Sequence, residues 1–413
     1  MREKPRPFRA GRDSAAALAA PVLAPPLNYC YLHIYFDNLL RITKRAYKYR
    51  FHPTSEQAQL LAQTFGCTRF VYNHILRWRT DAFYQRQEKI GYIQANAELT
   101  RIKRSGEFEW LNDVSCVPLQ QCLRHQQSAF KNFFEGRAKY PTFKKKHHRQ
   151  SIELTRSAFT YKNGQLYMAK SKEPLAIRWS RQLPSEPSTI TISKDCAGRY
   201  FVSCLCDFDP ETLPITPKMV GIDLGIKDLF VTSNGNKVGN PRHTAKYATL
   251  LARAQRSLSK KKLGSANRAK AKAKVARIHA KISDCRQDNL HKLSRTLINE
   301  NQVVCVESLK VKNMIRNPTL AKHIADASWG EFVRQLAYKA EWAGRSMVAI
   351  DQFFPSSKRC SCCGYTLSKL PLSVRDWECP ECGTHHDRDH NAAKNILAAG
   401  LAVKACGENV SLV

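Results

Sequence analysis

Two pairs of cysteines near the C-terminus have the spacing of a zinc site. Each pair follows the pattern Cys-x2-Cys, a glycine follows each pair, and fifteen residues separate them; the four residues are Cys360, Cys363, Cys379 and Cys382. Four thiolates at this spacing can converge on one tetrahedral Zn²⁺. Because four cysteines leave no ligand position open for water, the spacing predicts structural zinc rather than catalytic zinc.

The choice of ligands in the first pair is open at the level of sequence. The segment reads Cys-Ser-Cys-Cys, so Cys362 competes with Cys363. The chain holds 15 cysteines in all, and small buried thiols that pair by chance are the alternative to zinc. We interpret Cys362 as a non-ligand and Cys363 as the fourth ligand.

Three carboxylates stand at the ends of predicted elements. Asp223 lies in an apolar strand, Glu307 ends another apolar strand, and Asp389 opens the last helix. A carboxylate among apolar residues is costly unless it faces a metal or a hydrogen-bonding partner. Clustered carboxylates bind Mg²⁺ or Mn²⁺, and two such ions can activate a water and stabilise the leaving oxygen of a phosphodiester. The pattern predicts a nuclease or strand-transfer site.

Each of these assignments has a competitor. Helix capping alone would explain Asp389, because aspartate is a favoured N-cap residue. Asp387 competes with it for the third position, and Asp228 is a weaker competitor for the first. Only the joint arrangement of three acids at the edge of one predicted sheet favours the metal site.

The balance of charge indicates a polyanionic partner. The 413 residues include 67 Lys and Arg against 34 Asp and Glu, a formal net charge of +33, while 43% of the residues are hydrophobic. That length and hydrophobic fraction suit two or three folded domains. Nucleic acid is the partner that matches such a surface, and an anionic membrane is the weaker alternative.

Cysteine usage and hydropathy predict a soluble cytoplasmic protein. The cysteines are scattered from Cys30 to Cys406, unlike those of a small disulfide scaffold, and no run of ~18 apolar residues is present. The apolar stretch 15–27 follows arginines, as a signal peptide does, but three prolines would break its helix. We therefore expect residues 1–43 to be a flexible, dispensable extension, or sequence upstream of the natural start.

The elements that must position these residues form a multidomain α/β protein. Short strands at 44–52 and 150–215 predict a small β-barrel. Apolar residues at helical spacing between them predict a helical nucleic-acid recognition domain at 53–149, which interrupts the barrel. Strands and helices then mix in a nuclease domain at 216–413, with the zinc ribbon inserted at 356–386.

Three basic segments are the predicted contacts with nucleic acid. The first strand interleaves basic and aromatic residues, the linker at 139–149 is basic, and residues 253–281 contain eleven Lys and Arg without an acid. Such uncompensated charges repel one another unless a polyanion lies alongside, although a solvated charged face is the usual alternative. The predicted contact residues are Lys44, Arg45, Lys48, Arg50, Lys144, Lys145, Lys146, Lys260, Lys261, Lys262, Arg268 and Lys270.

Several motifs, in this combination and order, resemble the OrfB/TnpB proteins of bacterial insertion sequences. They are VGIDLGIKDL at 220–229, VCVESL at 304–309, the four-cysteine knuckle, and DRDHNAAKNI at 387–396. The opening segments RAYKYRFHPT at 45–54 and CTRFVYN at 67–73 also match, so the resemblance covers about residues 44–410.

The resemblance implies an RNase H-like fold of the RuvC type, with Asp223, Glu307 and Asp389 as the catalytic, Mg²⁺- or Mn²⁺-binding triad. It further implies relatedness to type V CRISPR effectors. The expected activity is then cleavage of double-stranded DNA, directed by a guide RNA from the element's own end, in the bacterial cytoplasm and on the nucleoid. The barrel and helical domains would read a short motif that flanks the target.

Two other functions are compatible with the same residues. One is a transposase proper, which would perform DNA strand transfer with the same triad. The other is a non-catalytic DNA-binding regulator in which the acids are relics. All three acids are present, so the sequence gives no indication of an inactive copy.

Overall fold

The structure is a computed structural model, and it describes residues 43–406. The predicted extension at 1–43 lies outside the described residues, except for Thr43, which begins the first strand. Within the described range the chain builds two five-stranded sheets and two separate two-stranded ribbons.

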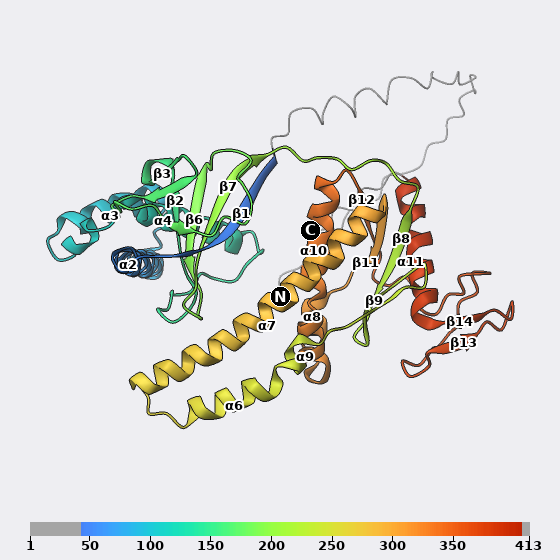
Figure 1. The fold of residues 1–413 in the computed structure, drawn as a ribbon. Helices are drawn as coiled ribbons and strands as arrows, with labels where there is room; N and C mark the ends of the chain where they lie inside the picture. Colours follow the sequence, from blue (N-terminus) through green and yellow to red (C-terminus); the bar gives the residue numbers. More distant parts are fainter. Residues whose placement is uncertain (1–42, 407–413) are drawn as a thin grey trace, which may run out of the picture. The chain divides into compact units, whose positions relative to one another are not determined.

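The first sheet is antiparallel, with the strand order β2-β6-β7-β1-β5 (Figure 1). Its longest pairing joins β1 to β7, with Arg45 opposite Cys206 and Phe51 opposite Tyr200. A separate hairpin is formed by β3 and β4. The strands are β1 (Thr43–His52), β2 (Gln150–Thr155), β3 (Phe159–Lys162), β4 (Gln165–Met168), β5 (Ala176–Ile177), β6 (Thr189–Lys194) and β7 (Tyr200–Phe208).

This sheet is not the closed barrel predicted from the sequence. Among the described strands, β2 and β5 stand at opposite edges and do not pair with each other. Helices supply the burial that closure would have given: Leu61 and Phe65 of α2 lie in the same core as Ile152 and Leu154 of β2. A sheet whose apolar face is covered by helices can remain open.

The helices inserted between β1 and β2 have a core of their own. They are α2 (Ser55–Arg86), α3 (Tyr92–Arg104), a 3₁₀ turn at Glu109–Asn112 and α4 (Cys116–Phe134). Val71, Ile75, Leu99 and Leu119 are buried together where α2, α3 and α4 meet. The predicted helical segment is therefore confirmed as helical, and residues 135–149 return to the sheet without regular structure.

The second sheet has the order β10-β9-β8-β11-β12. The first three strands form an antiparallel meander, whereas β8, β11 and β12 run parallel. The strands are β8 (Met219–Leu224), β9 (Asp228–Thr232), β10 (Lys237–Gly239), β11 (Val303–Glu307) and β12 (Ser346–Ile350). Strands β8 and β11 confirm the predicted apolar strands that carry Asp223 and end at Glu307.

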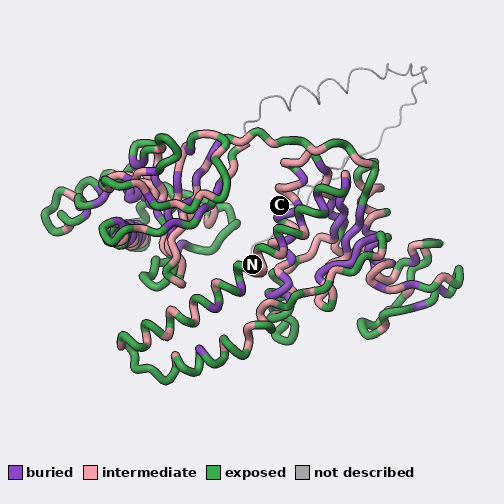
Figure 2. Tube along the Cα trace, in the orientation of Figure 1, coloured by how far each residue is buried: buried purple, intermediate pink, exposed green. Residues whose placement is uncertain are grey.

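Helices cover both faces of the second sheet. On one face, Val304 and Val306 share a core with Phe332 of α10 and Leu290 of α7. On the other face, Cys305 packs against α11 through Ile396. Figure 2 shows much of this sheet as buried. The helices are α5 (His243–Lys246), α6 (Ala248–Ser259), α7 (Ala266–Glu300), α8 (Val311–Met314), α9 (Pro318–Ala327), α10 (Trp329–Trp342) and α11 (Arg388–Ala405).

Helix α11 approaches β8 at Gly221, backbone against backbone. A Cβ atom at this position would lie 2.1 Å from the carbonyl oxygen of Ala393 and 2.6 Å from the nitrogen of Leu397. A substitution here must push α11 away from the strand that carries Asp223.

We predict that Gly221→Ala destabilises the fold by about 3 kcal/mol or more, because overpacking against rigid backbone cannot be relieved by a side-chain rotation. Gly239→Ala is the matched control, since its Cβ would meet no atom within 4 Å. Urea denaturation of both variants measures the difference. Equal stabilities would show that α11 does not pack on β8 in this way.

Candidate catalytic and zinc sites

Asp223 and Glu307 lie level with each other on neighbouring parallel strands. Val306 of β11 is opposite Ile222 of β8, and each acid is the next residue of its strand. Val306 and Ile222 are buried in the core beneath α7 and α10. Because successive side chains of a strand alternate, the two acids face the opposite side, where α11 packs. Strand pairing thus brings together two residues that are far apart in the sequence.

Asp389 lies in the first turn of α11 and acts electrostatically on Asp223, whereas Asp387 caps the helix. Asp387 is the N-cap of α11: its carboxylate accepts a hydrogen bond of 2.9 Å from the backbone N–H of His390. It also forms an ion pair of 2.5 Å with Lys237. Asp228, the other competitor, is the first residue of β9, and its backbone is opposite Gly239 of β10.

Glu307 and Asp389 both act electrostatically on Asp223. Burial raises the pKa of Asp223 to about 8, and the nearby Glu307 and Asp389 act in the same direction. Burial also raises the pKa of Glu307, against the effect of a hydrogen bond from Ser356. A divalent cation relieves both the desolvation and the repulsion of such carboxylates. Three carboxylate donors, two of which have raised pKa values without a metal ion, fit Mg²⁺ or Mn²⁺.

The outer two acids also have partners in the protein. Arg375 of the zinc segment forms an ion pair of 3.2 Å with Asp389, and the Ser356 hydroxyl donates a hydrogen bond to Glu307. The carboxylate oxygens are not drawn into one tight cluster: within residues 43–406, only the four cysteines bring three or more ligand atoms within 4.8 Å of one another. A cation bound by Asp389 would compete with Arg375.

The four predicted cysteines converge as a metal site. The sulfurs of Cys360 and Cys382 are 3.7 Å apart, and those of Cys363 and Cys379 are 3.6 Å apart. Tetrahedral Zn²⁺ with bonds of about 2.3 Å would require separations of about 3.8 Å. The cluster therefore has the size of a zinc site, and the ligand choice from the sequence agrees with it.

Local backbone turns point each cysteine pair inward. The backbone N–H of Gly364 donates to the carbonyl of Cys360 at 3.0 Å, and Gly383 repeats the contact to Cys379 at 2.9 Å. Both glycines have positive φ, which disfavours a side chain at these positions. Cys362 is exposed and lies outside the cluster.

The zinc segment is joined directly to the helix that carries Asp389. Its ribbon strands, β13 (Asp376–Glu378) and β14 (His385–Asp387), pair antiparallel, and α11 begins immediately after β14. The buried side chain of Asn391 donates to the Arg359 carbonyl at 2.7 Å and accepts from the Ser361 N–H at 2.9 Å. Asn395 donates to the Ser356 carbonyl at 2.8 Å. These hydrogen bonds thus hold the first turns of α11 against the first cysteine knuckle.

Sequence reasoning did not identify Ser356, Arg375, Asn391 and Asn395 as parts of this site. Serine, arginine and asparagine are common in loops and caps, and their contacts join positions far apart in the sequence. The signal that was available is the position of both asparagines on the buried, inward face of the last helix.

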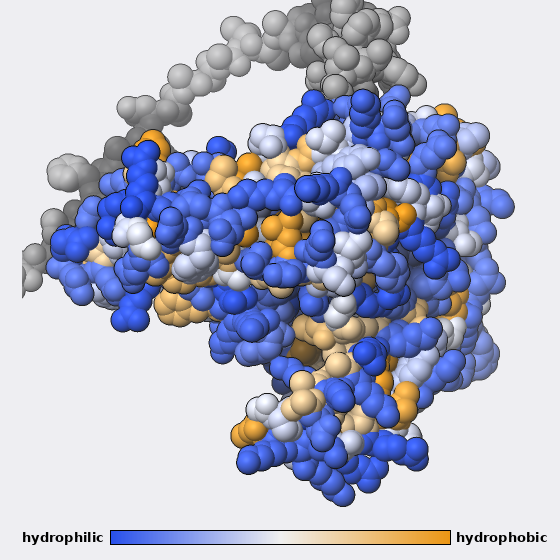
Figure 3. Space-filling model, turned by 60° about the vertical axis from the view of Figure 1, so that its left-hand side comes forward, coloured by the Kyte–Doolittle hydropathy of each residue, from blue (hydrophilic) through white to orange (hydrophobic). Residues whose placement is uncertain are grey.

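The predicted nucleic-acid-binding residues differ in whether their side chains also contact other parts of the protein. Most are exposed on β1, on the linker before β2 and on the α6–α7 turn, and the surface in Figure 3 is hydrophilic over most of its area. Arg268, however, donates to the carbonyls of Leu258 and Lys261 and so holds the α6–α7 turn together. Arg45 is stacked over Trp342 at 4.4 Å. These two residues have structural contacts in addition to their charge.

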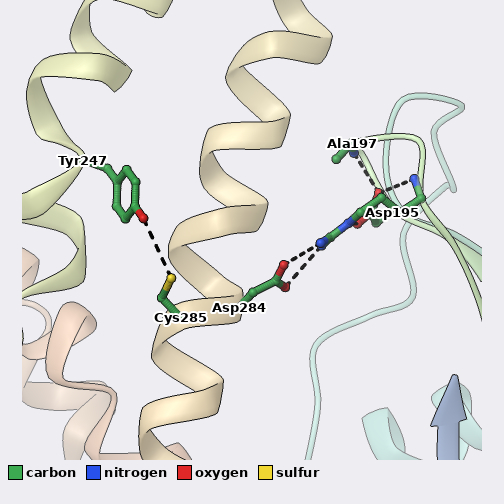
Figure 4. Close-up of polar contacts among 6 residues, drawn as sticks. Asp195, Ala197, Tyr247, Asp284 and Cys285 are labelled. Atoms are coloured by element: carbon green, nitrogen blue, oxygen red, sulfur yellow. Dashed lines mark hydrogen bonds and ion pairs between the residues drawn. The ribbon is translucent and has the colours of Figure 1, made fainter. Parts of the chain in front are cut away.

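The basic helix α7 is anchored to the first sheet. It is one continuous helix of 35 residues. Arg199, after the β6–β7 turn, forms ion pairs with Asp284 of α7 at 2.5 Å and with Asp195 at 2.7 Å; Figure 4 shows both carboxylates and the adjacent Tyr247–Cys285 contact. The anchoring leaves the lysines near the α6–α7 turn exposed.

Among the described residues, no helix has both the length and the apolar character needed to cross a membrane.

Three family models match separate parts of the chain. They are OrfB_IS605, described as "Probable transposase", at residues 203–318, HTH_OrfB_IS605, described as "Helix-turn-helix domain", at 43–88, and "Cas12f1-like, TNB domain" at 329–396.

Two similar proteins align with most of the chain. One from Streptomyces pristinaespiralis, named "Putative RNA-guided DNA endonuclease", is 54% identical over 375 residues, which are 90% of this chain and 93% of that protein. Another from Escherichia coli K12, of the same description and named InsQ, is 33% identical over 89% of this chain and 94% of its own length.

One solved structure resembles this fold at low sequence identity. The cryo-EM structure of a Cas12f1–sgRNA–target DNA complex matches with a TM-score of 0.50 and 14% identity, over 83% of both chains. This chain therefore shares the mixed α/β, multidomain fold of Cas12f1.

Proposed function

We propose that this chain, which belongs to the OrfB/TnpB family, is an RNA-guided DNA endonuclease encoded by an insertion sequence. The observation that carries the proposal is that Asp223 and Glu307 lie level on neighbouring strands and that Glu307 and Asp389 both raise the pKa of Asp223. The 54% identity to a relative named for this activity supports the same conclusion. Three carboxylates do not hydrolyse a phosphodiester bond without a metal ion, so the proposal includes a catalytic metal.

The proposed domain organisation follows the family. Residues 216–413 form an RNase H-like nuclease domain of the RuvC type, with the zinc ribbon at 356–386 inserted before the third acid. The mixed sheet, in which an antiparallel meander continues into parallel strands, supports this assignment. Residues 53–149 form the recognition helices, and 44–52 with 150–215 form the sheet that supports them.

Asp223, Glu307 and Asp389 would hold Mg²⁺ or Mn²⁺. When bound, such ions supply an activated water and stabilise the leaving 3'-oxygen of the phosphodiester. Ser356 fixes the orientation of Glu307 by its hydrogen bond. The zinc ribbon, through Asn391 and Asn395, fixes the start of α11 and with it Asp389.

The proposed partners are a guide RNA from the element's own end and a double-stranded DNA target. The net charge of +33 supports this pairing, because a guide together with a target strand supplies phosphates along an extended basic surface. The exposed lysines of β1, of the 144–146 linker and of the α6–α7 turn are the proposed contacts.

The test is purification of the protein from cells that carry its complete locus, followed by sequencing of the bound RNA. We expect one enriched RNA from the end of the element. The complex should then cut double-stranded DNA that matches the variable end of that RNA, and only in the presence of Mg²⁺ or Mn²⁺. Cleavage that does not depend on sequence matching would contradict the guided function.

We predict that Asp387 and Asp389 are separable by mutation. Asp389→Asn should lower cleavage by about 10³-fold or more, because it removes a metal ligand. Asp387→Asn should retain cleavage within a few fold, since asparagine also caps a helix and only the pair with Lys237 is lost. Single-turnover cleavage rates measure both. The opposite result would identify Asp387, and not Asp389, as the third metal-binding acid.

A transposase proper is the second candidate, favoured by the description of the matching OrfB_IS605 family model. Strand transfer would use the same acids but would join the cut 3' end to a new DNA. Incubation of the protein with labelled element ends and a plasmid distinguishes the two functions. Joined products would support the transposase, and cut products alone support the endonuclease.

A further inference from the structure

Two side chains outside the four-cysteine cluster lie within hydrogen-bonding distance of its sulfurs. The Nε2 atom of His386 is 3.0 Å from Sγ of Cys360. The hydroxyl oxygen of Thr384 is 3.2 Å from Sγ of Cys382. Cys360 and Cys382 form one of the two close pairs of sulfurs, 3.7 Å apart. Both contacts therefore reach the same edge of the cluster.

The two contacting residues come from one short segment of the ribbon. Thr384 immediately precedes β14, and His386 is the middle residue of that strand. Because they are two residues apart along an extended chain, their side chains point to the same face. The Cys379 N–H donates to the Thr384 carbonyl at 3.0 Å, and Trp377 of β13 lies opposite His386. Pairing of the ribbon strands thus directs both side chains toward the sulfurs.

His386 is buried together with the sulfur that it contacts. Its exposed fraction is 7%, and that of Cys360 is 1%. The imidazole packs against the indole of Trp377, with ring centroids 4.7 Å apart. A hydrogen bond between buried groups is stronger than an exposed one, because the local dielectric constant is low and water does not compete. We therefore expect His386 to matter more than Thr384, whose partner Cys382 is exposed.

The imidazole lies beside the metal site and is not a fifth ligand. Within residues 43–406, the group of ligand atoms that all lie within 4.8 Å of one another contains the four cysteines and not His386. Zinc-bound sulfurs are thiolates and carry no proton, so the imidazole N–H and the threonine hydroxyl must be the donors. Four thiolates exceed the charge of Zn²⁺, and hydrogen bonds to sulfur offset that excess.

We infer that His386 and Thr384 donate hydrogen bonds to the zinc-bound sulfurs of Cys360 and Cys382 and slow the loss of the metal. Both residues act on zinc through a sulfur, so they are positioning residues. Since β14 leads directly into α11, the same bonds fix to the metal the strand that precedes Asp389. This role requires zinc in the ribbon but does not depend on the nuclease function.

The test measures the transfer of Zn²⁺ from the purified full-length protein to a chromogenic chelator. His386→Phe keeps a ring against Trp377 but removes the N–H, and Thr384→Val removes the hydroxyl. His385→Phe is the matched control, because the His385 side chain is 81% exposed and pairs with Glu378. We expect release about tenfold faster in His386→Phe, a smaller acceleration in Thr384→Val and the wild-type rate in the control. His386→Gln keeps an N–H donor and should restore most of the retention.

Replacement of Zn²⁺ by Co²⁺ distinguishes this role from a purely structural one. The sulfur-to-cobalt charge-transfer band depends on the electron density of the thiolates, so loss of a donor should shift it to longer wavelength in His386→Phe but not in His385→Phe. The visible bands should indicate four sulfur ligands in every variant. If His386→Phe does not fold, the same band in Thr384→Val decides the question.

Three results would overturn the inference. One is a nitrogen ligand in the Co²⁺ spectrum of wild type, which would make His386 a ligand. Another is wild-type zinc release with an unshifted band in both His386→Phe and Thr384→Val. The third is an equal effect of His385→Phe and His386→Phe, which would show that any change in β14 loosens the metal.

Discussion

Asp223→Asn is expected to abolish DNA cleavage and at the same time to stabilise the metal-free protein. Loss of one anionic ligand from the proposed metal site removes several kcal/mol of transition-state stabilisation, so cleavage should fall by about 10³-fold or more. The gain in stability has a separate cause. The carboxylate is desolvated beside Glu307 and Asp389, which raises the pKa of Asp223 to about 8. The neutral amide does not carry this penalty.

The sign of the pH dependence follows from that raised pKa. An aspartate in the unfolded chain titrates near pH 4, whereas folded Asp223 titrates near pH 8. Between these values the folded state binds the extra proton, so wild-type stability falls as pH rises through this window. Asp223→Asn removes that contribution, and its advantage should reach the order of a few kcal/mol at pH 8.

Melting temperatures in EDTA from pH 5 to pH 8 measure this effect. The difference between Asp223→Asn and wild type should widen with pH, and added Mg²⁺ should raise the melting temperature of wild type more than that of the variant. Asp228→Asn is the control, because the raised pKa of Asp223 comes from burial, Glu307 and Asp389, so loss of the Asp228 charge should leave it in place. A constant difference across pH would show that Asp223 is not a desolvated carboxylate, and retained cleavage would remove it from the catalytic site.

Cys379→Ser is expected to release zinc and to lower cleavage by about 100-fold, although Cys379 does not touch the proposed catalytic acids. Loss of one of four thiolates weakens a structural zinc site, and the ribbon then loses its order. Because Asn391 and Asn395 tie the ribbon to α11, Asp389 loses its fixed position. A displacement of about 1 Å in a catalytic group can cost about 100-fold in rate.

Cys362→Ser is the matched control for this prediction. Cys362 lies in the same knuckle but is exposed and outside the four-sulfur cluster. It should retain one zinc per chain and wild-type cleavage, whereas Cys379→Ser should lose both. Zinc content by mass spectrometry and single-turnover cleavage give the two readouts. Full cleavage by a zinc-free Cys379→Ser protein would show that the zinc ribbon does not fix the position of Asp389.

The sequence alone determined the features that depend on local spacing. Four cysteines at fixed separations predicted the zinc ligands, and the structure brings the same four sulfurs together. Apolar runs predicted the strands that carry Asp223 and Glu307, because a buried strand needs a continuous run of apolar residues. The net charge predicted a polyanionic partner without reference to any fold.

Tertiary structure decided what depends on contacts between distant segments. The register of β8 against β11 sets Asp223 level with Glu307, and no local pattern specifies a register between strands that are eighty residues apart. Capping and the ion pair with Lys237 assign Asp387 to the helix end. The first sheet remains open because α2 and α4 cover it, and that covering is a packing outcome. Ser356 and Asn391 emerge as parts of the site only when the chain is folded, since their partners come from other elements.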